Sequence, residues 1–148
     1  MKMKILFTQK KEGKKDNPEL IGDYLSRIYK VKGDKVPPAY PCGSEILVIL
    51  CFENYGKIDQ KLVKFCQDLS TARAHNVALV ILSKDGSTDA GELTGIFKQN
   101  GVNVAGTCGI AVPKGLFGAK KVSDADTQKA KAFCDQMIDK LFDPSALS

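Results

Sequence analysis

Residues 45–52, EILVILCF, are apolar at every position after the first and rich in β-branched side chains. A strand of this composition is typical of the middle of a parallel sheet, where both faces are covered. A second run of the same kind, NVALVILS, occupies residues 76–83. The sequence therefore predicts two central strands here. The side chains expected to be more than about nine-tenths buried are Ile46, Val48, Leu50, Val77, Leu79 and Ile81.

Amphipathic patterns separate these runs from each other and from the ends of the chain. Apolar side chains recur at helical spacing after Asn17-Pro18-Glu19, which has the form of an N-cap, a first-turn proline and a first-turn acid. Further along, Ser123 and Asp126 form a rough capping box. Helices are therefore predicted over residues 17–28, 58–69, 89–100 and 123–142, the third of them closed by Gly101.

Strands are also predicted over residues 3–8 and 102–112, so strands and helices alternate along the chain. This alternation indicates right-handed crossovers, and therefore a doubly wound α/β domain in which helices cover both faces of a parallel sheet. Pro37, Pro38 and Pro41 allow at most a short edge strand before residue 45. We expect one such domain over residues 1–148.

The composition is that of an ordinary globular protein, with 148 residues, of which 43% are hydrophobic and 26% charged. The chain begins without the apolar segment of a signal peptide, and no apolar run reaches the roughly 18 residues of a membrane span. We therefore expect a cytoplasmic protein that does not enter a membrane. The five cysteines are scattered without a C-x-x-C pair, and His75 is the single histidine. Reduced, mostly buried thiols and no metal site are expected.

The net charge of +5 has a local origin. Lys10, Lys11, Lys14 and Lys15 flank Gly13, and a patch of this kind attracts an anion, whether a phosphate, an acidic partner protein or nucleic acid. Nucleic acid is the least favoured of these, because no aromatic side chains alternate with the lysines to stack on bases.

Several segments resemble the flavodoxin family. Residues 47–58, LVILCFENYGKI, are similar to the third strand of flavodoxins and the loop after it, which carries an aromatic residue and a glycine before a helix. Residues 77–80 resemble the fourth strand, and residues 3–7 take the place of the first. Gly115-Leu116-Phe117-Gly118, followed by a capped helix, resembles the tail of short bacterial flavodoxin domains. The likeness runs in order along nearly the whole chain, and it implies five parallel strands in the order 2-1-3-4-5.

The resemblance implies that the protein binds FMN and transfers electrons. Flavodoxins bind FMN outside the carboxyl ends of the strands, at the switch point between the first and third strands. Their phosphate loop aligns with residues 10–15, KKEGKK, where only Gly13 matches the family. In place of the family's hydroxyl groups, Lys10, Lys14 and Lys15 are expected to supply the charge that holds the phosphate.

The other two loops of the expected site follow the third and fourth strands. The resemblance assigns Glu53, Asn54, Tyr55 and Gly56 to the flavin ring, with Tyr55 stacked against it and the charge of Glu53 lowering the potential of the last electron. It assigns the backbone of the loop after the fourth strand to the pyrimidine edge of the flavin. The residues of that loop are Ser83, Lys84, Asp85 and Gly86.

No hydrolytic site is expected, because His75 precedes a strand whereas the reactive edge of a parallel sheet lies at the carboxyl ends. Enzymatic activity would therefore depend on bound flavin, and a redox partner protein is the expected partner. Alternatives remain at each position. Residues 83–87 also suit a plain glycine turn, and the glycines of residues 106–109 suit close backbone packing. The alternative for the whole chain is a binding or regulatory module that has lost flavin, and a domain for another anionic ligand such as a nucleotide is the least favoured hypothesis.

Overall fold

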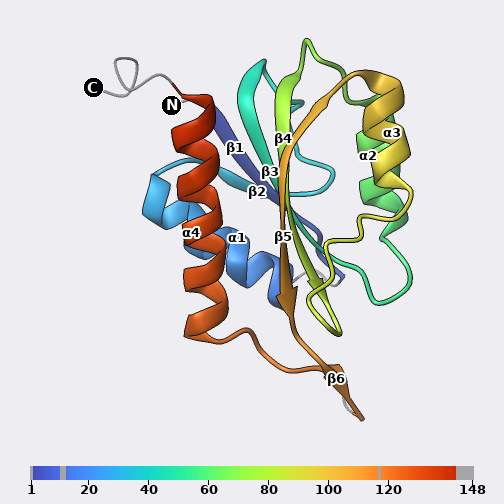
Figure 1. The fold of residues 1–148 in the computed structure, drawn as a ribbon, viewed down its shortest axis with the longest axis vertical. Helices are drawn as coiled ribbons and strands as arrows, with labels where there is room; N and C mark the ends of the chain where they lie inside the picture. Colours follow the sequence, from blue (N-terminus) through green and yellow to red (C-terminus); the bar gives the residue numbers. More distant parts are fainter. Residues whose placement is uncertain (1, 11–12, 117, 143–148) are drawn as a thin grey trace.

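A computed structural model describes residues 2–10, 13–116 and 118–142 (Figure 1). Five strands form its central sheet in the order β2-β1-β3-β4-β5, and every neighbouring pair is parallel. The predicted doubly wound architecture and strand order are therefore confirmed. The strands are β1 Met3–Phe7, β2 Gly33–Lys35, β3 Glu45–Glu53, β4 Ala74–Ser83 and β5 Asn103–Ala111. Lys11, Glu12, Phe117 and the chain after residue 142, all used in the sequence-based predictions, lie outside the described residues.

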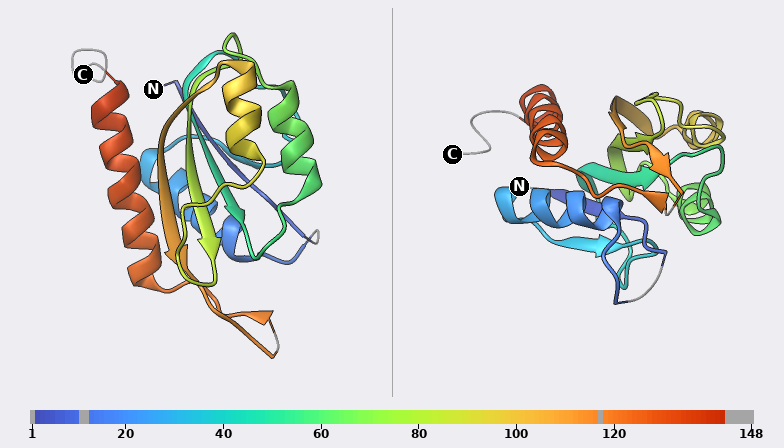
Figure 2. Two further views of the ribbon diagram at one scale, coloured as in Figure 1. Left: turned by 45° about the vertical axis from the view of Figure 1, so that its right-hand side comes forward. Right: turned by 90° about the horizontal axis from the view of Figure 1, so that it is seen from below.

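Two helices cover each face of the sheet, as Figure 2 shows from below. The helices are α1 Asn17–Tyr29, α2 Gln60–Asp68, α3 Leu93–Asn100 and α4 Asp124–Leu141. Helices α1 and α4 lie on one face, and α2 and α3 lie on the other. Three of the predicted helices begin within two residues of the observed start, but α3 begins at Leu93 rather than Asp89. The reason is local, since the Asp89 carboxylate accepts a hydrogen bond from the Gly91 N–H (2.7 Å) and holds this segment in a turn.

The two faces of the sheet form two separate hydrophobic cores. Alternate residues of β3 point to opposite sides, so that Leu47 and Ile49 pack toward α1 and α4 while Val48 and Leu50 pack toward α2 and α3. Five of the six core side chains predicted from the central strands are buried as expected. The exception is Ile46, which is only partly buried because it lies at the amino end of β3, next to the exposed His75.

The Asn17 side chain connects the start of α1 to the segment just before α4. Asp16, rather than the predicted Asn17, is the N-cap residue of α1. The buried Asn17 side chain instead donates to the Lys120 carbonyl (2.7 Å) and accepts from the Val122 N–H (3.0 Å), just before α4. The predicted capping box of α4 is present, with reciprocal hydrogen bonds between Ser123 and Asp126.

A small antiparallel hairpin, which the sequence did not predict, projects beyond the sheet between β5 and α4. Its strands are β6 Lys114–Gly115 and β7 Gly118–Ala119. All five cysteines are buried free thiols, as expected. Within the described part of the chain, no helix has the length and apolar character needed to cross a bilayer.

Candidate functional site

The loops after β1, β3 and β4 leave the sheet at the same end, because the strands are parallel. Three cavities of about 370, 450 and 480 Å³ lie along this edge. Of the twelve residues assigned to a flavin site, ten line at least one of these cavities. Gly13 is exposed in the loop after β1, and Gly86 packs against β5, so neither of these two faces a cavity.

Tyr55 lies between the cavities of about 370 and 480 Å³ and contributes to the walls of both. Its hydroxyl donates a hydrogen bond to the Val112 carbonyl (2.7 Å), and the Lys114 ammonium lies 4.2 Å from the centre of its ring. Burial, together with the nearby charge of Glu53, raises the pKa of Tyr55 to about 12. Tyr55 therefore connects the loop after β3 to the segment after β5. The contribution of Lys114 was not predicted from the sequence.

The loops after β3 and β4 are held together by side chains that bond to the backbone. The Asn54 amide donates to the Asp89 carbonyl (2.9 Å), and its oxygen accepts from the Gly56 N–H (3.1 Å). Ser83 accepts from the Gly86 N–H (3.0 Å). A Cβ at Gly109 would collide with the Gly86 carbonyl oxygen, so the expected close backbone packing of the 106–109 segment is confirmed there. These contacts fix both loops against each other and against β5.

Lys10 and Glu53 form an ion pair across the edge of the sheet, with 3.0 Å between Nζ and Oε1. The Glu53 side chain is only 12% exposed, whereas that of Lys10 is largely in solvent. The pair separates the cavity beside Tyr55 from the cavity beside α1, since both residues line both cavities. The negative charge of Glu53 therefore has a partner in the protein itself.

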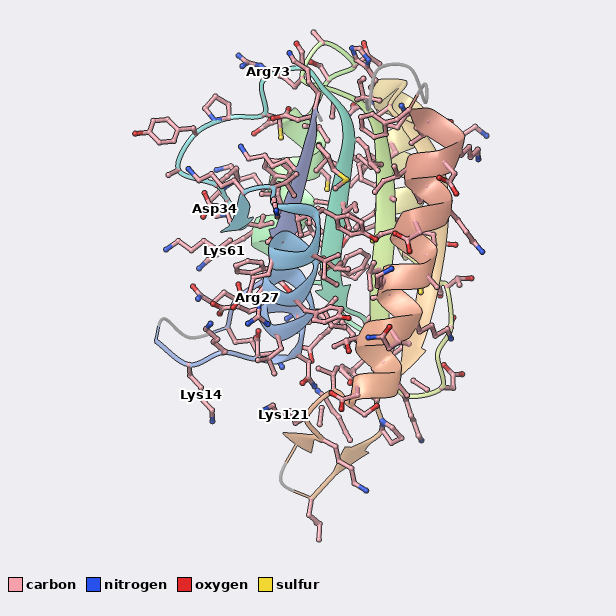
Figure 3. All side chains as sticks on the ribbon, turned by 90° about the vertical axis from the view of Figure 1, so that its left-hand side faces the viewer. Lys14, Arg27, Asp34, Lys61, Arg73 and Lys121 are labelled. Atoms are coloured by element: carbon pink, nitrogen blue, oxygen red, sulfur yellow. The ribbon has the colours of Figure 1, made fainter. Side chains whose placement is uncertain are left out.

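Lysine side chains surround the cavity of about 450 Å³ at the start of α1. Lys10, Lys14, Lys15 and Lys121 all line it. Lys15 is paired with Asp23 (2.6 Å). Figure 3 shows Lys14 and Lys121 at the same end of the molecule and Arg73 at the opposite end. Lys121 was not predicted, because it lies more than a hundred positions from the loop after β1.

Asp16 is the other residue at this cavity that the sequence did not single out. Its Oδ2 accepts a hydrogen bond from the Lys10 N–H (3.2 Å), so the carboxylate caps the loop after β1 beside the first turn of α1. Burial raises the pKa of Asp16, while the hydrogen bond from the Lys10 N–H opposes that shift. The N-terminus of a helix favours a bound anion. At the start of α1, a carboxylate of the protein itself already lies beside that position.

These features fit the two ends of a flavin to different degrees. On the ring side, an aromatic side chain stands between two cavities, as a flat aromatic ligand requires. On the phosphate side, lysines provide positive charge, but Asp16 and Pro18, which has no N–H, leave few backbone donors at the start of α1. The residues present therefore fit an aromatic ring, and they fit a phosphate by charge rather than by a cradle of amides.

A scan against models of protein families found no match, and a search of curated proteins found none either. Among solved structures, the chain is similar to a flavodoxin of Streptococcus pneumoniae TIGR4, with a TM-score of 0.64 and 14% identity over 93% of this chain and 98% of that one. It is also similar to oxidised flavodoxin 1 from Bacillus cereus, with a TM-score of 0.60 and 13% identity over 93% of this chain and 97% of the other. At this identity, the likeness shows that the three proteins share a fold.

Proposed function

We propose that this chain, which has a flavodoxin-like fold, binds FMN at the carboxyl edge of its sheet and serves as an electron carrier. The observation that carries the proposal is the position of Tyr55 between two cavities, beside the switch point between β1 and β3. The two similar structures, both flavodoxins, add support at the level of the fold.

The residues of the chain would have distinct tasks. Tyr55 would contact the ring, and Asn54 with Gly56 would shape one wall while Ser83, Lys84 and Asp85 shape the other. Lys10, Lys14 and Lys15 would hold the phosphate as point charges. Bound FMN would supply reversible one- and two-electron transfer. Because Glu53 is paired with Lys10, its effect on the flavin potential would depend on that ion pair. The surrounding lysines favour an acidic redox partner.

The test is a titration of the purified protein with FMN and with riboflavin, which lacks the phosphate, followed by visible absorbance at low and high salt. FMN should bind more tightly than riboflavin at low salt. This advantage should shrink at high salt, because solvent-exposed charge contacts are screened over a Debye length of about 8 Å at physiological ionic strength. Equal affinities for FMN and riboflavin at low salt would show that the lysines do not bind the phosphate. No absorbance change with either ligand would refute flavin binding.

A variant pair tests the role of the ring. Tyr55→Leu should weaken the binding of both flavins by about 2- to 10-fold, because the lost stacking is worth roughly 0.5–1.5 kcal/mol. Tyr40→Leu is the matched control, since Tyr40 is 70% exposed and does not line any of the three cavities. If the two variants weakened binding equally, Tyr55 would not be in the flavin site.

A second candidate is a flavin-free module that recognises an anionic ligand or partner. The Asp16 carboxylate near the start of α1 and the Lys10–Glu53 ion pair favour it, because both occupy the region where a flavin phosphate would lie. Affinity enrichment with the wild-type protein and with the Lys10/Lys14/Lys15→Glu variant tests this candidate. It requires a partner that only the wild-type protein retains.

A further inference from the structure

The cavity at the start of α1 contains two carboxylates among its lysines, and only one of them forms an ion pair. Glu53 is paired with Lys10 at 3.0 Å. Asp16 forms no ion pair with any described residue, although four lysines line the same cavity. Its Oδ1 is buried and has no hydrogen-bond partner among the described residues. A buried carboxylate oxygen without a partner is costly, so its retention here calls for a physical explanation.

The position of Asp16 suggests what the carboxylate does. Its backbone carbonyl accepts from the Leu20 N–H (3.0 Å) in the first turn of α1, and its side chain folds back to the Lys10 N–H. The carboxylate therefore lies between the helix start and the lysine-lined cavity, where a bound anion would gain most from both. A second anion in that cavity would be repelled by Asp16 at short range.

We propose that Asp16 is a built-in competitor for phosphate: its carboxylate takes the anion position in this cavity, so that a phosphate monoester binds less tightly when Asp16 is charged than when it is neutral. The proposal applies to any phosphate monoester. It depends on the proposed function only if that monoester is FMN. Asp16 is thus a specificity-determining residue, which sets how strongly the cavity accepts doubly charged anions.

The competition should depend on pH. The charged groups that line the cavity with Asp16 are Lys10, Lys14 and Lys15 from its own loop, Glu53 from β3 and Lys121 from the segment before α4. Burial, the largest cause, and the charge of Glu53 raise the pKa of Asp16. Protonation of Asp16 as the pH falls would therefore remove the competing charge while the lysines stay positive, and anion affinity would rise.

Sulfate is the appropriate probe, because its charge is constant over this pH range and it does not involve a flavin ring. We would measure sulfate binding by calorimetry and by amide shifts of the full-length protein, for the wild type and for Asp16→Asn. The variant retains an oxygen that can accept from the Lys10 N–H. It should bind sulfate at neutral pH about tenfold more tightly, the ratio that corresponds to one pKa unit of interaction, and its affinity should depend less on pH. Asp139→Asn, the same charge change on the exposed side of α4, should behave as the wild type.

Equal sulfate affinity of the wild type and Asp16→Asn, or no binding by either, would overturn the proposal. Asp16→Ser provides a second neutral variant with a good N-cap side chain, in case the asparagine perturbs the loop. The proposal and the proposed function can fail separately. Sulfate binding enhanced in Asp16→Asn, without flavin binding to any variant, would support the competitor and refute the flavin carrier. Flavin binding, together with equal sulfate affinities of the wild type and Asp16→Asn, would support the flavin carrier and refute the competitor.

Discussion

At the scale of single residues, Tyr55 makes the most informative contacts of the site. Its hydroxyl is bonded to the Val112 carbonyl, and its ring is covered on one side by the Lys114 ammonium. A cation over an aromatic face contributes about 0.5–1 kcal/mol at an exposed position. Tyr55 therefore fixes the segment after β5 against the loop after β3, and a ligand that stacks on the covered face must first displace Lys114.

The pKa of Tyr55 provides a direct check of this environment. The difference between the ultraviolet titration curves of the wild type and Tyr55→Phe should have its midpoint near pH 12 rather than at the usual value of 10. Because the unfolded chain loses this proton first, the contribution of Tyr55 to stability should fall as the pH rises from about 10 to about 12. A midpoint at the ordinary value would show that the Tyr55 hydroxyl is freely solvated.

Several residues of the candidate site could be predicted from the sequence and others could not, for physical reasons. Tyr55 and Asn54 follow directly from the end of an apolar strand, which is a local pattern. Lys114 reaches Tyr55 from a hairpin 59 positions further along, and no local pattern records that contact. Asp16 and Asn17 are equally good capping residues, so composition alone does not say which of them caps α1.

At the scale of elements, α4 depends on the cap at its start. Ser123→Ala removes the hydroxyl that accepts from the Asp126 N–H (3.2 Å), and should lower the free energy of unfolding by about 1 kcal/mol. Urea denaturation of the variant measures the change. Ser70→Ala is the matched control, because Ser70 is exposed and makes no side-chain hydrogen bond within the described residues. If both variants lost the same stability, the capping box would contribute nothing.

The central strands carry the largest energetic weight. Leu79 in β4 is buried in the core beneath α2 and α3, and Leu79→Ala should destabilise the protein by roughly 2–5 kcal/mol, as for other buried leucines. Val104→Ala, on the edge strand β5 where the side chain is 37% exposed, should change stability by about 0.5 kcal/mol or less. Similar effects of the two variants in urea denaturation would contradict the assignment of β4 to the core.

The central strands β3 and β4 were the most predictable elements, because short, continuous apolar runs are typical of strands in a sheet that is covered on both faces. The start of α3 was less predictable, since Asp89 can begin a helix or hold a turn, and here it holds a turn. The hairpin β6–β7 has only two residues in each strand, too few for a periodic signal.

At the scale of the whole molecule, parallel strands gather three loops at one end and leave His75 and Arg73 at the other. The central claim is that this carboxyl edge holds a flavin. The most direct test is a two-dimensional amide NMR spectrum recorded before and after addition of FMN. We predict shifts at residues 54–56 and 83–86, with no change at His75 and Arg73. Shifts confined to the amino end of the sheet, or a spectrum that FMN leaves unchanged, would contradict the claim.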